Sequence, residues 1–297
     1  MICVFRLPPA PLSACVRGMM TVGSDDDHLN AGRTWRLALL RCHTSTGLAR
    51  GGLVLVTQCS FDRLHALERI LAAWDGAVSC AMLLEQRDTA NGQSNEAASV
   101  KRMEAAVRAV HARYSDRLVV DILCRSQRDA SKPYPINLLR NASLQNSSLI
   151  RNTSLVWIVD VDCVPSAGAL AALVGSPERA AALHRLCCDE GDVLVVPCIE
   201  RAAPSLSEAH GVTDVRQPPT IAEAKAALQQ GVAWPFMHAR WPQGHRATGF
   251  EAWASAGNEL FLGPLAFEEC FEPYVVVSRA LCPRFDETLT GCARPIC

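Results

Sequence analysis

The sequence SLVWIVDVDCVPS, residues 154–166, places two aspartates directly after an uninterrupted apolar run. The run at 155–159 is short, rich in β-branched residues and free of charge, which is typical of a central strand covered on both faces of a sheet. In an extended chain the side chains of Asp160 and Asp162 point to the same side, about 6.5–7 Å apart. The pattern therefore predicts a core strand that delivers two carboxylates to the carboxyl edge of an α/β sheet, where ligands bind.

The segments around this run alternate between strand and helix patterns. Strand patterns occur at residues 51–60, 77–84, 117–124, 192–200 and 271–279, and helical patterns at 61–74, 95–114, 134–148, up to about 186 after the acidic pair, and 220–231. Such alternation indicates an α/β fold with a mostly parallel central sheet flanked by helices. Residues 232–267 are rich in Trp, Pro and Gly and are expected to be irregular.

Length and composition favour one large domain. The chain has 297 residues, of which 49% are hydrophobic, so it can bury a full core. Residues 1–50 show no sustained hydrophobic period and contain several Pro and Gly residues, so we expect a poorly ordered leader there. Residues 51–297 then form the domain.

Charge, hydropathy and cysteine spacing narrow the class of protein. The 29 Lys and Arg residues nearly balance the 30 Asp and Glu residues, which disfavours a nucleic-acid partner. No segment reaches the roughly 18 consecutive apolar residues of a membrane helix, so no membrane segment is predicted. The 14 Cys residues include no C-x-x-C pair, which argues against a zinc site. Most are expected to be small buried residues, with a disulfide or two if the compartment is oxidising.

The acidic pair suits a divalent cation. Carboxylates at the end of an apolar strand lose solvation unless a positive charge lies between them. Mg²⁺ or Mn²⁺ takes oxygen ligands from one or two carboxylates together with substrate phosphates, and would neutralise the charge of a diphosphate leaving group. The alternative is a purely structural role, in which Asp160 caps the following turn and Asp162 is a solvated loop residue or a helix N-cap.

A hydrophobic strand that ends in D-x-D also resembles the first motif of haloacid-dehalogenase-type phosphatases. Asp160 would then be the nucleophile and Asp162 the acid/base. That chemistry needs a downstream lysine, and Lys225 is the only lysine after Asp162. Because Lys225 is expected on the solvated face of a helix, and because the motif lies in the middle of the chain, this reading is the weaker one.

Six stretches, collinear and similarly spaced between about residues 52 and 291, resemble the glycosyltransferases of the LARGE and β-1,4-glucuronyltransferase type. They are VTQCSFDRLHALERILAAWDGAVSCAMLL (56–84), YPINLLRN (134–141), VDVDCVPS (159–166), VVPCIE (195–200), RWPQGHRATGFEAW (240–253) and FEPYVVVSR (271–279). The resemblance implies a GT-A fold, a single α/β domain for nucleotide-diphospho-sugars.

The resemblance also implies an activity. Asp160 and Asp162 would hold Mn²⁺, with Mg²⁺ as the alternative, on the diphosphate of a UDP-sugar donor. The reaction would be inverting transfer of glucuronic acid, or alternatively xylose, to a hydroxyl of a glycan acceptor. Members of this family work in the Golgi lumen behind an N-terminal membrane anchor, and no anchor or signal is visible in this sequence.

Other candidate site residues follow from the matched motifs. Polar residues just before the metal strand are candidates for the donor's phosphate, ribose or sugar, namely Tyr134, Asn137, Arg140 and Asn141. Arg140 is the best candidate for a phosphate because its hydrogen bonds are charge-assisted. The alternative for Asn137 and Arg140 is a helix cap and a surface ion pair.

Two further sets of candidates lie later in the chain. Trp241 and His245 lie in a Gly-containing loop that could close over the sugars, or that simply packs in an irregular segment. An inverting transfer needs a base for the acceptor proton, and among Glu200, Glu272 and Asp286 we favour Glu272 over Glu200. Either glutamate could instead be an acceptor for backbone amides.

The sequence departs from the family pattern in several places. Gln243 stands where the family usually has Lys, and the stretch after Asp286 lacks the family's G-F-G-W-N-K motif and the His-containing strand beyond it. The resemblance therefore implies a domain that is incomplete at its C-terminus. The alternative function is a truncated, non-catalytic relative that binds UDP or a glycan weakly. Among three sequons, Asn146 and Asn152 are better candidates for glycosylation than Asn141.

Overall fold

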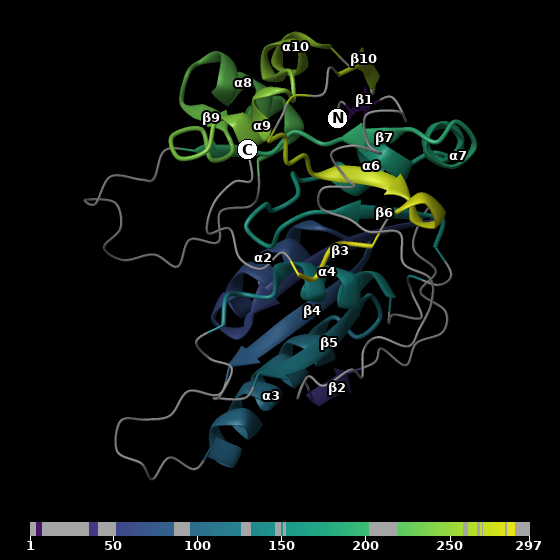
Figure 1. The fold of residues 1–297 in the computed structure, drawn as a ribbon. Coiled ribbons are helices and arrows are strands. Elements are labelled where there is room, and N and C mark those ends of the chain that lie inside the picture. The colour runs from purple at the N-terminus through teal and green to yellow at the C-terminus, as the bar shows by residue number, and fades with distance from the viewer. Residues whose placement is uncertain are drawn as a thin grey trace.

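The computed structural model describes residues 4–7, 36–40, 52–85, 96–125, 132–145, 150, 153–201, 219–257, 261–265, 268, 270–282 and 284–288. Within these residues a nine-stranded sheet runs through the molecule in the order β10-β1-β7-β11-β6-β3-β4-β5-β2 (Figure 1). Its strands are β1 (Val4–Leu7), β2 (Arg36–Leu40), β3 (Leu53–Ser60), β4 (Ala77–Glu85), β5 (Leu118–Arg125), β6 (Leu155–Ile158), β7 (Val193–Val195), β10 (Phe261–Pro264) and β11 (Val275–Ser278).

The centre of the sheet is parallel. Strand β3 pairs in parallel with both β4 and β6, and β4 pairs in parallel with β5. Strand β11 lies antiparallel between β6 and β7, although it comes much later in the chain (Figure 1). The α/β fold class with a parallel centre is therefore confirmed, and β6 is an inner strand, as its apolar sequence predicts.

Helices cover both faces of the parallel strands. On β4 the side chains of Cys80, Met82 and Leu84 pack in one cluster with α2 (Leu64–Ala73) and α3 (Glu96–Arg113). The alternate residues Ala81 and Leu83 pack in a second cluster with α4 (Ile136–Gln145). Because successive side chains of a strand point to opposite faces, α4 lies on the face opposite α2 and α3.

The second half of the chain is more regular than its composition predicts. After β6 come α6 (Ala169–Val174), α7 (Pro177–His184) and a short π-helical turn. The predicted strand at 192–200 is divided into β7 and β8 (Ile199–Arg201) around Pro197, which has no N–H for a strand ladder. The region expected to be irregular contains β9 (Ala233–Pro235), α9 (Gln243–Arg246), α10 (Phe250–Ser255) and β10.

The expected leader contributes two strands to the sheet. β1 lies between β7 and β10, and β2 pairs with β5 at the other edge. Both strands lie before residue 51, within the stretch that the sequence predicts to be a leader. Their pairing partners are distant in sequence, which a search for local periodicity cannot detect.

Lys225 is not on a solvated face. It lies on α8 (Ile221–Gln229), is 9% exposed, and donates hydrogen bonds to the carbonyl oxygens of Ala256 and Gly257 at 2.6 and 3.2 Å. Its ammonium also lies 5.6 Å from the ring centre of Trp253. The long side chain thus binds the C-terminal end of α10, where a cation is favourable.

Among the described residues, no helix is both long enough and apolar enough to cross a membrane.

The packing of α2 leads to a stability prediction. The side chain of Leu67 is fully buried against the sheet, so Leu67→Ala should lower the free energy of unfolding by about 2–5 kcal/mol. Arg69 is an exposed residue of the same helix, and Arg69→Ala should change it by less than about 0.5 kcal/mol. Urea unfolding followed by circular dichroism measures both. Equal losses for the two variants would contradict this account of the core.

Candidate active site

Three strands bring polar residues to one edge of the sheet. Since β3 and β6 are parallel, with Val56 opposite Ile158, their carboxyl ends meet at the same edge. Since β11 is antiparallel to β6, with Val275 opposite Ile158, it begins at that edge. Gln58, Asp160 and Tyr274 therefore come together there, although each is more than 100 residues from the next along the chain.

The two aspartates lie in a turn, not on an extended strand. Strand β6 ends at Ile158, and the backbone N–H of Cys163 donates to the carbonyl of Asp160 at 3.0 Å. Before the turn, the N–H of Val159 donates to Val56 at 3.1 Å, which ties it to β3. The expectation that both carboxylates leave one face of a strand is thus wrong, and each has its own surroundings.

Asp160 is held by three side chains. One carboxylate oxygen accepts from Arg140 at 3.0 Å and from the amide of Gln58 at 3.4 Å, and the other accepts from the hydroxyl of Tyr274 at 3.2 Å. The Tyr134 hydroxyl in turn donates to the amide oxygen of Gln58. Two predicted residues, Tyr134 and Arg140, therefore join Asp160, while Gln58 and Tyr274 are additions that the structure supplies.

These contacts keep Asp160 ionised. Burial alone would raise the pKa of its carboxyl, but the charge and hydrogen bond of Arg140, together with the hydrogen bonds of Tyr274 and Gln58, lower it below the ordinary value. Burial and the neighbouring negative charge raise the pKa of Tyr274, so its hydroxyl keeps its proton and remains a donor. The site therefore holds a fixed anion.

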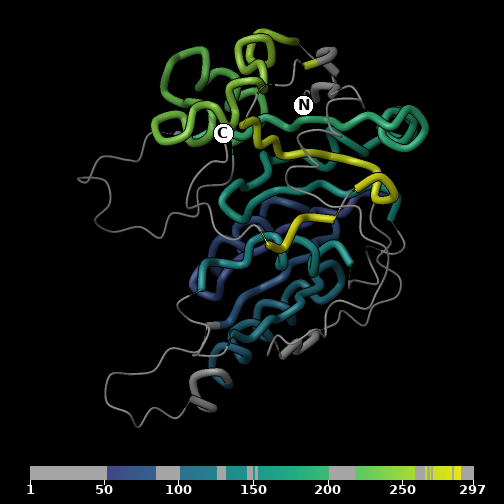
Figure 2. The backbone as a smooth tube through the Cα atoms, viewed as in Figure 1, coloured from purple at the N-terminus to yellow at the C-terminus, as the bar shows by residue number. Residues whose placement is uncertain are grey.

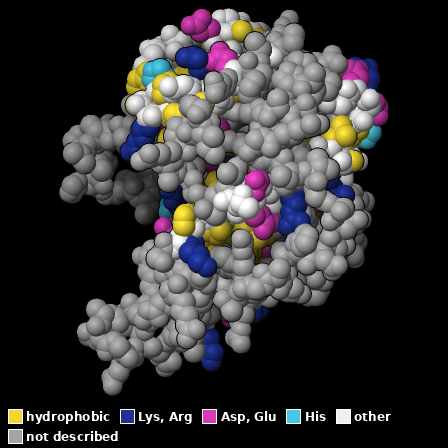
Figure 3. Space-filling model, in the orientation of Figure 1, with side chains coloured by type: hydrophobic (Ala, Val, Ile, Leu, Met, Phe, Trp, Pro, Cys, Tyr) yellow, Lys and Arg dark blue, Asp and Glu magenta, His cyan; other side chains and the backbone are white. Residues whose placement is uncertain are grey.

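Asp162 is held less firmly. Its carboxylate forms an ion pair with Arg63, which follows β3 in a short 3₁₀ helix (Phe61–Arg63). The two side chains are 46% and 44% exposed, so water weakens this pair. Acidic and basic side chains lie close together in other places on the surface as well, as near the middle of the face shown in Figure 3.

The two candidate bases differ in their surroundings. The pKa of Glu272 is raised above the ordinary value by loss of solvation, while the charge of Arg140 opposes the rise and that of Asp160 adds to it. Glu200 lies on β8, and its carboxylate accepts a hydrogen bond from the backbone N–H of Met237 at 3.2 Å. Because Met237 has a positive φ of 59°, this bond supports an unusual backbone turn. Glu200 therefore has a structural contact, and the Glu272 carboxyl lies within the electrostatic influence of Arg140 and Asp160.

His245 and Trp241 belong to one compact loop. The ring of His245 is buried between Phe236 and Tyr274, with centroids 5.4 and 5.3 Å away. A Cβ added at Gly244 would collide with the ring of Trp241, and the carbonyl of Gly244 accepts from the N–H of Glu272 at 2.8 Å. The loop thus packs against the ring of Tyr274 through His245 and fixes the backbone of Glu272 through the carbonyl of Gly244.

Asn137 and Asn141 bind the chain itself. Asn141 exchanges two hydrogen bonds of 2.9 Å with the backbone of Phe285, and Asn137 donates to the carbonyl of Asp286 at 2.8 Å. Figure 2 shows this late segment lying against α4. The arrangement favours a structural role for both amides, and it leaves the buried Asn141 unavailable for glycosylation in the folded chain. Asn146 and Asn152 lie outside the described residues.

The same segment supports Arg140 from the other side. The guanidinium of Arg140 lies 5.3 Å from the ring centre of Phe285, within reach of a cation–π contact. Arg140 is therefore fixed between Phe285 and Asp160. The predicted alternative of a surface ion pair does not describe it, because the ion pair is at the centre of a hydrogen-bonded network.

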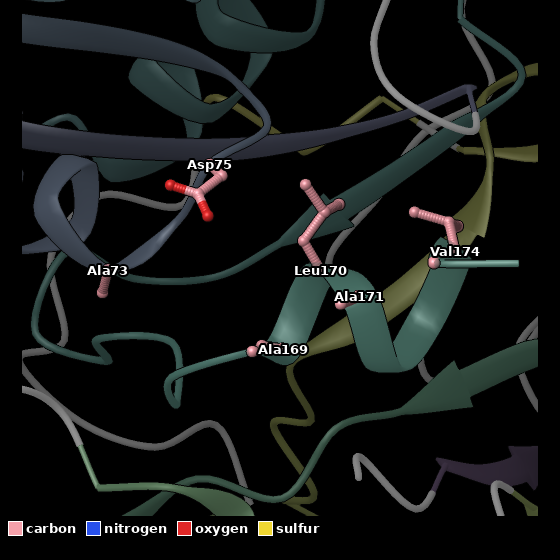
Figure 4. A pocket seen from close by; sticks show the side chains of 8 residues that line it. Ala73, Asp75, Ala169, Leu170, Ala171 and Val174 are labelled. Carbon is pink, nitrogen blue, oxygen red and sulfur yellow. The ribbon is translucent and has the colours of Figure 1, made fainter.

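A pocket away from the acidic turn lacks the polar network that surrounds Asp160. It lies between the end of α2 and helix α6 and is lined mainly by small apolar residues, with Asp75 at its rim (Figure 4). Its cavity volume is about 310 Å³. The residues that line it include no member of the Asp160 network, so the polar sheet edge remains the candidate site.

Comparison with known proteins decides the family. A family model described as "Glycosyl-transferase for dystroglycan" matches residues 92–294. The chain belongs to this family.

Relatives within the family carry transferase names. A LARGE2s protein of Gallus gallus, named a xylosyl- and glucuronyltransferase, is 30% identical over 243 residues, and human LARGE1, with the same kind of name, is 27% identical over 239. Each match covers 80% of this chain but only 28% and 27% of the relative. The chain thus spans less than a third of the length of these relatives.

Family membership overturns the phosphatase interpretation. That interpretation needed a lysine near Asp160, and the only candidate, Lys225, is bound to the end of α10. The polar network around Asp160 contains no lysine, which agrees with a glycosyl-transferase and not with that phosphatase mechanism.

The burial of His245 predicts a pH dependence of stability. Burial lowers the pKa of His245 from 6.5 to about 4, against the opposing charge of Asp160. Between these values the unfolded chain binds a proton that the folded chain does not, so stability is lost as pH falls through this window. Lowering the pH from 7 to 4.5 should cost roughly 2–3 kcal/mol through this residue.

Urea unfolding of the parent and of His245→Phe at the two pH values measures this contribution. The variant should lack it, whereas His184→Gln, a change at an exposed histidine on α7, should retain it. An unchanged pH dependence in His245→Phe would show that the buried ring titrates as it does in water.

Proposed function

We propose that this chain is a metal-dependent, inverting glycosyltransferase that moves a sugar from a UDP-sugar to a glycan hydroxyl. Glucuronic acid is the favoured donor sugar and xylose the alternative, in keeping with the names of the relatives. The observation that carries the proposal is the pair Asp160 and Asp162 at the carboxyl edge of the sheet, each matched by an arginine. A Golgi location belongs to the same proposal.

The donor set suits Mn²⁺, with Mg²⁺ as the alternative. Both prefer oxygen ligands, and Asp160 is kept ionised. Among the described residues no group of three or more His, Cys, Asp or Glu side chains surrounds a common point, so the remaining ligands would come from diphosphate oxygens and water. Bound there, a divalent cation would neutralise the charge that develops on the UDP leaving group.

Two arginines suit the same diphosphate. Arg140 and Arg63 pair with the two carboxylates that would hold the cation. Once a cation takes over that neutralising role, both guanidinium groups are free to donate to phosphate oxygens, which match their planar geometry. Arg140 keeps its position because Phe285 supports it.

Glu272 is the proposed general base. Its raised pKa makes it a better proton acceptor than an ordinary glutamate, and the charges of Arg140 and Asp160 both act on it. In the proposed step the acceptor hydroxyl oxygen bonds to the anomeric carbon, the bond from that carbon to UDP breaks, and the hydroxyl proton passes to Glu272.

The acidic pair is tested by calorimetric titration of UDP with Mn²⁺ and then with a chelator. Asp160→Asn and Asp162→Asn should each abolish the Mn²⁺-dependent part of the binding, because a neutral amide is a poorer ligand for a divalent cation. Asp75→Asn, at an aspartate that is 82% exposed and outside this network, should bind like the parent. A folded parent that binds no UDP with Mn²⁺ would leave the alternative of a non-catalytic relative.

The base is tested by transfer kinetics with UDP-glucuronic acid, UDP-xylose and glycan acceptors. Glu272→Gln should lower kcat by about 10²–10⁴-fold while UDP affinity is retained, since the amide cannot take a proton. Glu200→Gln should keep most of the activity, because an amide oxygen can still accept from Met237. The opposite order of the two losses would move the role of base to Glu200.

A further inference from the structure

A disulfide lies directly beside the acidic turn. It joins Cys163, the residue after Asp162, to Cys198, which lies between β7 and β8. Cys163 also closes the turn through its backbone bond to Asp160. The covalent link therefore acts on the backbone at the position next to the Asp162 side chain.

The two aspartates differ in how firmly other side chains hold them, and so in how much they depend on a restrained backbone. Asp160 is fixed by Arg140, Tyr274 and Gln58. Asp162 has the half-exposed Arg63 as its ion-pair partner, and exposed pairs of this kind hold a side chain weakly. What places Asp162 is then the backbone that carries it, which the disulfide restrains.

The far end of the disulfide is firmly anchored. The N–H of Val196 donates to the carbonyl of Tyr274 at 2.8 Å, and the carbonyl of Cys198 accepts from the N–H of Phe236 at 3.0 Å. Tyr274 itself donates to Asp160. Residues 196–198 are therefore connected to Asp160 through hydrogen bonds by way of Tyr274, and through the disulfide to Cys163, the residue after Asp162.

We propose that the Cys163–Cys198 disulfide is a positioning device for Asp162, which keeps its carboxylate in place near Asp160, where both would bind a divalent cation. The proposal rests on the metal-dependent UDP binding proposed above. Cys163 and Cys198 touch no reacting group, so their effect passes entirely through the turn. Without the link Asp160 keeps its place and Asp162 loses its own.

The first experiment examines the turn without any ligand. Peptide mapping under non-reducing conditions must first find the Cys163–Cys198 link in the parent. Hydrogen–deuterium exchange then compares the parent with the double variant Cys163→Ala/Cys198→Ala. Variants are used instead of a reductant because Cys270 is also disulfide-bonded. Amides at 160–164 should exchange at least about tenfold faster in the variant while those of β6 stay protected. Absence of the link, or unchanged exchange in the turn, overturns the proposal.

The second experiment measures UDP affinity with and without Mn²⁺. The double variant should lose about tenfold or more of the Mn²⁺-dependent affinity, the typical effect of removing a group that orients a metal ligand, with binding in chelator unchanged. Cys188→Ala is the matched control, since its thiol lies near Ser154 at the opposite end of β6. Parent-like affinity in a double variant that has a loosened turn overturns the proposal.

A double-mutant cycle separates positioning from general destabilisation. If the disulfide acts through Asp162, removing it from the Asp162→Asn chain should change UDP affinity no further. A second, additive loss would show that the link acts elsewhere and would overturn the proposal. If the parent binds no UDP with Mn²⁺, the proposed function fails by that result, and the positioning claim is decided by hydrogen exchange at 160–164.

Discussion

The placement of β6 between a parallel neighbour and an antiparallel one is the constraint on which the site depends. Pairing with β3 fixes where the turn after Ile158 begins, and pairing with β11 fixes where Tyr274 enters the same edge. Three segments from distant parts of the sequence thereby meet with a register set by backbone hydrogen bonds. The burial of the strand on both faces makes this register costly to change, because a shift by one residue would exchange its two faces.

Charge compensation at this edge follows a simple logic. A carboxylate that leaves water needs a cation and hydrogen-bond donors, and Asp160 obtains both from Gln58 on β3, Arg140 on α4 and Tyr274 just before β11. Asp162 stays nearer to water and needs less support from side chains. The site therefore combines one anion that is held by three side chains with one that has a single, half-exposed partner.

Much of this could be predicted from local sequence, and the rest could not for physical reasons. The apolar run of β6 and the face of α2 that includes Leu67 follow from periodicity, and the matched motifs mark Asp160, Arg140 and Tyr134 as candidates for one site. Gln58 and Tyr274 lie within matched stretches, but their contact with Asp160 comes from strand pairing, which no local pattern predicts. The turn at Asp160 depends on where β6 stops, and the burial of Lys225 depends on the carbonyls of α10 that it meets. The strands before residue 51 likewise depend on distant partners.

Gly244 has a consequence for how related sequences can diverge. Its missing side chain leaves the space in which the ring of Trp241 lies, while its carbonyl holds the backbone of Glu272. A side chain at this position would need the space that the Trp241 ring occupies, and the same peptide is bonded to the backbone of the proposed base. Lineages that retain activity should therefore tolerate change at the exposed neighbour Gln243 but change Gly244 only together with Trp241, so that these two positions evolve as one unit.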